Sequence, residues 1–178
     1  IPAGRLGGGP SIQGQGKYLI DAGHSTTIYN GECVKISSGY VVGGNGSAAN
    51  IVGVLNGIFF NAATTLKPTF SNFYKATITP ANSEDTTAFV MDDPYQQYVV
   101  SSDAARTQAQ HLATYDMNSS AGSDITGKSS STLDTSETSA DGKQFRLLRT
   151  AEDPENEDIT AAFFSGIVVS NLNSFNQV

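Results

Sequence analysis

The sequence predicts a mainly β protein, an antiparallel β-barrel or sandwich with one short helix and an extended N-terminal arm. The first observation is composition: of 178 residues only 15% are charged, while glycine and small polar residues are abundant. The second is patterning, because short runs rich in β-branched and aromatic residues alternate with clusters of Gly, Asn, Asp and Ser. Both are typical of strands joined by tight turns. The length suits one domain carrying an arm.

The arm is expected at residues 1–16, which are rich in glycine and contain no helical or strand periodicity. Such a segment buries too little apolar surface to order itself. Ile1, Leu6 and Ile12 are spaced along it as apolar contact points. Two interpretations stay open: a disordered tail, or an arm that becomes ordered on a neighbouring subunit. Residues 17–178 are expected to form a single β domain.

Within the domain, the strongest hairpin signal is Asn30-Gly31, a pair that favours a two-residue turn between paired strands. The run at 50–61 predicts a central strand with a glycine bend. Its apolar residues alternate with period two, which places one set on a common side of the strand: Val52, Val54, Ile58 and Phe60.

Two acidic turns follow apolar strands. Asp92 and Asp93 precede Pro94 between the runs 88–91 and 95–100, and are predicted to form the tip of a β-hairpin with both carboxylates in solvent. Asp153 lies in a second acidic turn, between a strand containing Phe145 and Leu147 and a last strand at 167–169. One end of the barrel or sandwich is expected to carry both tips.

One helix is predicted within 101–117, one or two turns long. Ser102 or Asp103 is the expected cap, and Ala105, Ala109 and Leu112 recur on one face. The polar stretch at about 118–143 is expected to be a long loop or a peripheral hairpin.

The titratable residues do not fall into a catalytic or metal-binding pattern. Asp92 and Asp93 are neighbours in one turn, whereas acid–base catalysis needs carboxylates in different environments. The two histidines, His24 and His111, lack the spacing of zinc ligands. Cys33, the only cysteine, is expected to be a core residue. The chain is therefore predicted not to be an enzyme and to need no cofactor or metal. A hydrolase built from distant residues remains an alternative, if Asp92 or Asp93 is buried beside a histidine.

The charge balance argues against two kinds of partner, nucleic acids and membrane surfaces. The net charge is −7 and only ten residues are Lys or Arg, so we expect no direct contact with nucleic acid and no polybasic membrane patch. No apolar run approaches the ~18 residues of a transmembrane helix.

Four segments carry a resemblance to a known group of proteins: "NIVGVLNGIFF", "AFVMDDPYQQYVV", "DITGKSSSTLD" and "FRLLRTAEDPENE". In order and spacing they resemble capsid decoration (cement) proteins of tailed bacteriophages, a small structural-protein group common in marine and aquatic phages. The likeness covers roughly residues 11–178, and "VVSNLNSF" departs from the more charged ending of the group. The resemblance implies a β-barrel or tulip-like body, commonly a homotrimer, on the outer surface of the virion. It implies the major capsid protein, of HK97-type fold, as partner, with N-terminal arms reaching neighbouring subunits.

The resulting hypothesis is a structural virion protein that stabilises the capsid by bridging neighbouring major capsid protein subunits. Leu6, Pro10 and Ile12 are the expected arm contacts, and the acidic tips at Asp92, Asp93 and Asp153 are docking elements if they face the shell. The alternative is a carbohydrate-binding or tail-fibre (receptor-binding) β module, which would present Tyr95, Tyr98 and Phe73 on one flat face.

Overall fold

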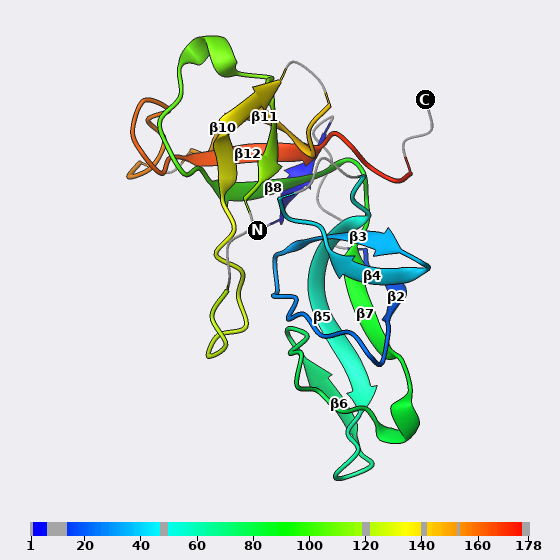
Figure 1. Cartoon of the computed structure of the whole chain (residues 1–178). Helices are drawn as coiled ribbons and strands as arrows, with labels where there is room; N and C mark the ends of the chain where they lie inside the picture. The colour runs from blue at the N-terminus through cyan, green and yellow to red at the C-terminus, as the bar shows by residue number, and fades with distance from the viewer. Residues whose placement is uncertain are drawn as a thin grey trace.

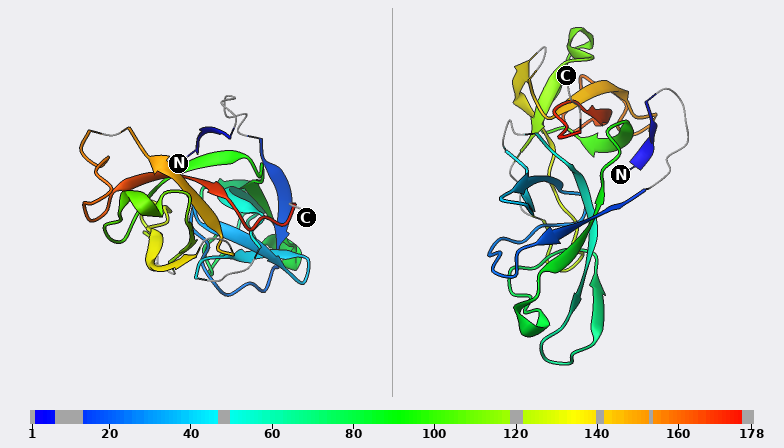
Figure 2. Two further views of the ribbon diagram at one scale, coloured as in Figure 1. Left: turned by 90° about the horizontal axis from the view of Figure 1, so that it is seen from above. Right: turned by 90° about the vertical axis from the view of Figure 1, so that its right-hand side faces the viewer.

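The computed structural model describes residues 2–6, 14–46, 50–118, 122–139, 142–152 and 154–175. Over these ranges the chain is mainly β, as predicted, and its strands form two six-stranded antiparallel sheets, here sheet A and sheet B. Figure 1 shows sheet A at one end of the molecule and sheet B at the other. The molecule is longest along the direction that joins them (Figure 2).

Sheet A combines strands from both ends of the chain. Each strand pairs with its neighbours in antiparallel fashion. The order is β1 (Pro2–Arg5), β8 (Gln96–Ser101), β12 (Ser165–Ser170), β11 (Phe145–Thr150), β9 (Thr114–Met117) and β10 (Leu133–Ser139). Phe145 and Leu147 share the buried face of β11, as the alternation in the sequence predicts.

Sheet B is built from a continuous part of the chain. Its order is β2 (Gly16–Ile20), β7 (Thr86–Met91), β5 (Gly53–Asn61), β3 (Cys33–Ser37) and β4 (Tyr40–Gly43), and β6 (Pro68–Ser71) also pairs with β5. The prediction of a central strand at β5 is confirmed, because it pairs with three others. β4 lies near β2, at the opposite edge, so sheet B curls towards a barrel.

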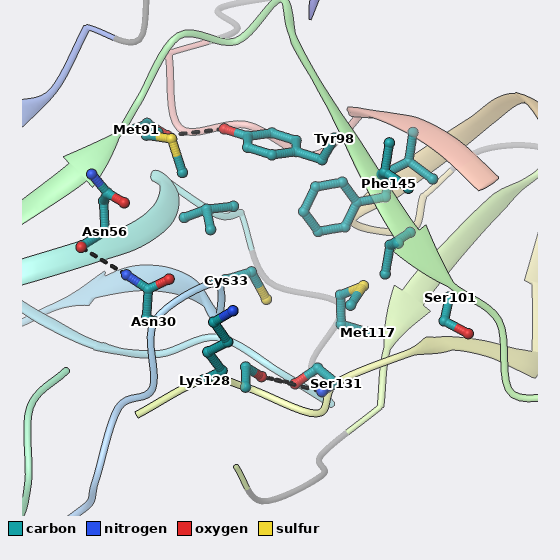
Figure 3. Close-up of a pocket in the computed structure, with 16 residues that line it drawn as sticks. Asn30, Cys33, Asn56, Met91, Tyr98, Ser101, Met117, Lys128, Ser131 and Phe145 are labelled. Carbon is teal, nitrogen blue, oxygen red and sulfur yellow. Dashed lines mark hydrogen bonds between the residues drawn. The ribbon is translucent and has the colours of Figure 1, made fainter. Parts of the chain in front are cut away.

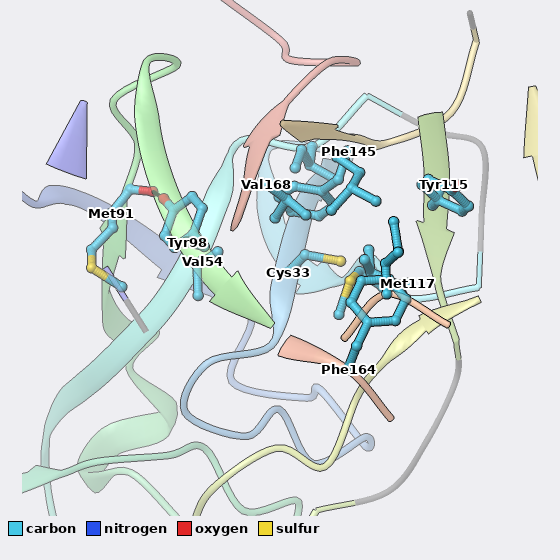
Figure 4. Packing of buried hydrophobic residues seen from close by; sticks show 13 residues of the cluster. Cys33, Val54, Met91, Tyr98, Tyr115, Met117, Phe145, Phe164 and Val168 are labelled. Carbon is cyan, nitrogen blue, oxygen red and sulfur yellow. Dashed lines mark hydrogen bonds between the residues drawn. The ribbon is translucent and has the colours of Figure 1, made fainter. Parts of the chain in front are cut away.

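Two apolar clusters make up the core. One fills the inside of the curled sheet B and includes Ile20, Val34 and Leu55. The other lies between the sheets and includes Cys33, Tyr98 and Phe145. Figure 4 shows side chains of this second cluster converging from strands of both sheets. Burial of these side chains, at about 25 cal/mol per Å² of apolar area, is the main force joining the sheets.

A bulge in β5 sends neighbouring residues to different cores. The register between β5 and β7 shifts between Leu55 and Gly57. Val54 belongs to the cluster between the sheets, whereas Val52 and Ile58 belong to the cluster inside sheet B. The predicted common face is therefore wrong for Val54, because the extra residue between Val54 and Ile58 reverses the alternation. Val52 precedes the first residue of β5, so the alternation of the strand does not apply to it.

The hairpin predicted at Asn30-Gly31 differs from the structure. At Asn30-Gly31 the chain does turn, since the Glu32 N–H donates to the Tyr29 carbonyl over 3.1 Å. The flanking segments pair with other partners, however, and the hairpin forms instead between β3 and β4. It turns at Ser38-Gly39, where both residues adopt positive φ, of 51° and 87°.

The acidic turn at Asp92-Asp93-Pro94 is not a hairpin tip. β7 before it belongs to sheet B and β8 after it belongs to sheet A, so the turn carries the chain from one sheet to the other. Buried and exposed residues alternate along β7 and β8 in the same way whether the two strands form one hairpin or belong to different sheets. The sequence therefore did not distinguish these two topologies. The second acidic turn does connect paired neighbours, β11 and β12.

The predicted helix is a single 3-10 turn, Gln108–Gln110, capped by Thr107. Ala105, Ala109 and Leu112 are all exposed, so the expected apolar face does not pack on the core. Neither expected cap acts as one: Ser102 is buried in a bridge to Leu133, and Asp103 accepts a hydrogen bond from the Thr135 N–H. The polar stretch after β9 returns as β10, which pairs with β9.

One buried amide joins the sheets. Gln144, just before β11, is fully buried, and its Nε2 donates to the carbonyl of Gly44, beyond β4, over 2.6 Å. Its Oε1 accepts from the Met117 N–H over 3.1 Å. Beside it, Lys143 Nζ lies 3.0 Å from Asp116 Oδ2. The amide thus satisfies backbone groups of both sheets that would otherwise be costly to bury.

Candidate functional site

Three of the residues predicted to contact a partner, Leu6, Asp92 and Asp93, meet at the β7–β8 link. The Tyr95 N–H donates to Asp93 Oδ1 over 3.0 Å, and the Gln96 N–H donates to the Asp93 carbonyl over the same distance. This is the aspartate-stabilised turn that the Asp-Pro sequence predicts. It holds Tyr95 at the surface, with 53% of the residue exposed.

Leu6 lies against the same link. β1 pairs with β8, and the Leu6 N–H continues this pairing by donating to the Tyr95 carbonyl over 2.8 Å. Leu6 is 49% exposed. An apolar and an aromatic side chain are thus fixed next to each other by the backbone, beside two carboxylates. We call Leu6, Asp92, Asp93 and Tyr95 the link surface.

The two carboxylates of the link surface are not equivalent. Both aspartates are half-buried, so the expectation of two solvated side chains is wrong. Asp92 Oδ2 accepts a hydrogen bond from the Tyr18 hydroxyl of β2 over 2.8 Å. Burial, with this hydrogen bond, raises the pKa of Tyr18. Asp92 therefore fastens the link to sheet B, while Asp93 shapes the turn.

Pro10, Ile12 and Asp153 lie outside the described residues. Next to Asp153, Glu152 is exposed and its Oε1 lies 3.3 Å from Arg149 Nη1. That pair is surface-exposed on both sides and adds little stability.

The sulfur and imidazole groups lie in structural surroundings. Cys33 is buried, as predicted, and its thiol donates to Asn45 Oδ1 over 2.8 Å. Burial raises the pKa of this thiol. The His24 ring lies against the Tyr74 ring, with centroids 5.5 Å apart, and burial lowers its pKa. Within the described ranges, no three His, Cys, Asp or Glu side chains are placed to share a metal ion.

The flat aromatic face expected for a carbohydrate-binding module does not form from the predicted residues. Tyr98 is only 6% exposed, and its hydroxyl donates to the Met91 carbonyl in the core between the sheets. Phe73 stacks on Tyr29, with ring centroids 5.8 Å apart. Of the three, only Tyr95 is prominent at the surface.

A second apolar surface crosses the outer face of sheet B, and sequence reasoning missed it. Strand register places Leu19, Thr87, Phe59 and Phe70 side by side across four strands. Phe70 is 66% exposed, and its ring lies 6.0 Å from that of Phe89 in the adjoining position. We call Leu19, Phe59, Phe70 and Phe89 the apolar row. Alternation within each strand placed these side chains on one face, but only the strand order brings them together.

A cavity of about 470 Å³ opens between the sheets (Figure 3). Its inner wall is apolar, and the side chains that form it belong to the core cluster: Cys33, Val54, Met91, Tyr98, Met117, Phe145 and Val168. Its rim is polar and includes Asn30, Lys128 and Ser131. The lining residues come from strands spread along most of the chain, so no local sequence motif predicts the cavity.

Comparison with known proteins found no match among family models, curated proteins or solved structures. None of the helices in the described ranges is long and apolar enough to span a membrane.

Proposed function

We propose that this chain is a structural virion protein that binds the outside of a tailed-phage head. In this role it stabilises the capsid by bridging neighbouring subunits of the major capsid protein, the partner implied by the resemblance of its sequence segments. The observation that carries the proposal is the link surface, where Leu6 meets the Asp93–Tyr95 turn. It supports a docking role because three residues predicted separately as contacts, Leu6, Asp92 and Asp93, lie at one surface.

The chemistry of the link surface suits protein recognition. Leu6 and Tyr95 are about half exposed and held by backbone hydrogen bonds, so little conformational entropy is lost when a partner covers them. Tyrosine is among the residues that most often dominate binding energy. The neighbouring carboxylates call for basic groups on the capsid subunit, which would make docking weaker at high salt.

The arm adds a second contact. In the sequence, Leu6 is followed within six residues by Pro10 and Ile12, the other predicted arm contacts. If Leu6 docks on one capsid subunit and the following residues on its neighbour, the second contact becomes intramolecular. Such tethering raises avidity by ~10²–10⁴, which is how a small protein bridges two subunits.

Point substitutions at the link surface test the proposal. Deleting residues 1–12 would also remove β1 from β8, so Leu6→Glu and Tyr95→Ser separate contact from fold. We expect each to weaken binding to expanded heads at least about tenfold, the scale of a lost hot-spot residue. The measurement is cosedimentation of purified protein with heads that lack decoration.

Ile125→Ser is the matched control, because Ile125 is an exposed apolar residue, 96% accessible, outside the link surface. It should decorate heads like the native chain. Retained decoration by both link variants, with unchanged circular dichroism, would contradict the proposed docking surface. Binding to a glycan array that is lost in Tyr95→Ser would instead support the carbohydrate-binding alternative.

The proposed homotrimer is supported by the apolar row. Copies of a chain with net charge −7 repel each other over most of their surface. The apolar row contains no acidic side chain, and the charged residue beside it is Lys17 of β2, paired with Phe89. A second copy of the chain is therefore its proposed occupant, and contact there would cover Phe59 and Phe70.

A further inference from the structure

The cavity between the sheets has the chemistry of a ligand site. Its volume, about 470 Å³, falls within the usual ~300–1,000 Å³ range of small-molecule sites. Voids of this size are rare in a close-packed interior. The inner wall is formed by buried side chains, among them Met91, Met117 and Phe145, each at most 7% exposed.

The polar groups around the cavity are mostly committed to the protein itself. Asn30 Nδ2 donates to the Asn56 carbonyl over 2.7 Å, and the Tyr98 hydroxyl donates to the Met91 carbonyl over 3.2 Å. The Cys33 thiol donates to Asn45. The interior therefore offers an apolar body van der Waals contacts with few polar groups left to satisfy.

Lys128 supplies the charge at the rim. Asp124, four residues before it, is paired with Lys75 at 3.0 Å, and no described carboxylate forms an ion pair with Lys128. Its backbone is held at the mouth, because the Ser129 N–H donates to the Asn30 carbonyl over 2.9 Å and the Asn30 N–H donates to the Gly127 carbonyl over 2.8 Å. Figure 3 shows its side chain extending towards the other lining residues.

We propose that this cavity binds a small amphipathic monoanion. The apolar body lies against Met91, Met117 and Phe145, and the anionic head lies at the rim beside Lys128. The charge of Lys128 and the apolar wall together determine which ligands bind. A cation would be repelled by Lys128, and a compact polar anion would make no contact with the inner wall. The proposal is independent of the proposed role on a phage head.

The two methionines of the chain provide a direct test, because both line the cavity. Protein labelled with ¹³C at the methionine methyls gives two signals, both reporting on the cavity and neither on the apolar row. The probe is decanoate below its micelle concentration. Decanol and decyltrimethylammonium have matched chains with a neutral and a cationic head. We expect decanoate to shift both signals saturably and to bind more tightly than either analogue.

Lys128→Gln should weaken decanoate binding about fivefold, as expected for one partly exposed charge pair, and leave decanol binding unchanged. Lys17→Gln, an exposed lysine on β2, is the control and should bind decanoate like the native chain. The absence of a saturable shift of both methyl signals would overturn the proposal. So would equal decanoate affinity in Lys128→Gln and the native chain, or binding of decyltrimethylammonium as tight as that of decanoate.

Discussion

Glu32 is a carboxylate that the fold buries between a turn and a strand. It is 8% exposed, and its Oε2 accepts a hydrogen bond from the Tyr29 N–H over 3.0 Å. Burial raises the pKa of Glu32, and this hydrogen bond offsets the rise only in part. The folded chain therefore holds the proton more tightly than the unfolded chain does.

This raised pKa predicts a specific pH dependence. The contribution of Glu32 to stability is complete below the ordinary glutamate pKa and is lost as pH rises through the raised pKa of the folded state. Glu32→Gln keeps an acceptor for the Tyr29 N–H but cannot ionise. We expect it to unfold at a higher temperature than the native chain at pH 8, with the difference vanishing near pH 4. Calorimetry at both pH values measures this, and an equal gain at both would contradict it.

Single residues also show where sequence reasoning fails. Cys33 was predicted to be buried because a lone small sulfur side chain in a strand usually packs in the core. The carbohydrate-binding alternative required Tyr98 on an exposed face, and Tyr98 is buried because β8 turns that side towards sheet B. Gln144 looks like an ordinary loop residue beside a polar stretch, and its buried amide bonds to the backbone of Met117 and of Gly44, 100 residues earlier. Such contacts leave no local pattern.

At the scale of elements, the link between β7 and β8 is the junction of the two sheets. The hydrogen bond from Tyr18 to Asp92 ties this junction to β2. Hydrogen bonds to a charged acceptor contribute about 1.5–3 kcal/mol when buried, and partial exposure reduces this. We expect Tyr18→Phe and Asp92→Ala each to lower the free energy of unfolding by about 1–2 kcal/mol.

The double variant checks that the two residues act through each other. If they do, its loss is smaller than the sum of the single losses by about 1 kcal/mol. Urea unfolding followed by circular dichroism supplies all the values needed. Strict additivity would mean that Asp92 and Tyr18 contribute independently.

Element existence was more predictable than element pairing. The runs that became β5, β11 and β12 carry the β-branched and aromatic residues of buried strands, and they were identified correctly. The helix predicted within 101–117 is only the 3-10 turn Gln108–Gln110, because alanines at helical spacing do not extend a helix without a surface to cover. Pairing errors at Asn30-Gly31 and at Asp92-Pro94 arose because a turn signal fixes where the chain bends, and not which strand it meets next.

At the scale of the whole molecule, the apolar row predicts self-association. The native chain should sediment as a trimer, whereas Phe70→Ser removes the most exposed aromatic side chain of the row and should shift the population to monomer. Analytical ultracentrifugation measures the change. Leu112 is an exposed apolar residue beside the 3-10 turn and outside the apolar row, so Leu112→Ser should leave the trimer intact. Identical sedimentation of Phe70→Ser and the native chain would assign the row to another partner.

The link surface was partly predictable from the sequence, whereas the apolar row and the cavity were not. Leu6, Asp92 and Asp93 were each named from local signals, an apolar residue in a glycine-rich segment and an acidic turn before proline. Their meeting at one place follows from the pairing of β1 with β8, which no local signal gives. The apolar row and the cavity were missed, because each is assembled by strand order from residues that look ordinary in isolation.

The pairing of β1 with β8 also sets an order of events during synthesis. Sheet B uses only residues 16–91, so all of its strands are synthesised before β8 begins at Gln96. β1 emerges first, yet its partner β8 follows 91 residues later, and the rest of sheet A ends at Ser170. Contacts so distant in sequence form slowly. We therefore expect the strands of sheet B to pair before β1 finds β8, and β1, while unpaired, to be open to pairing with another chain.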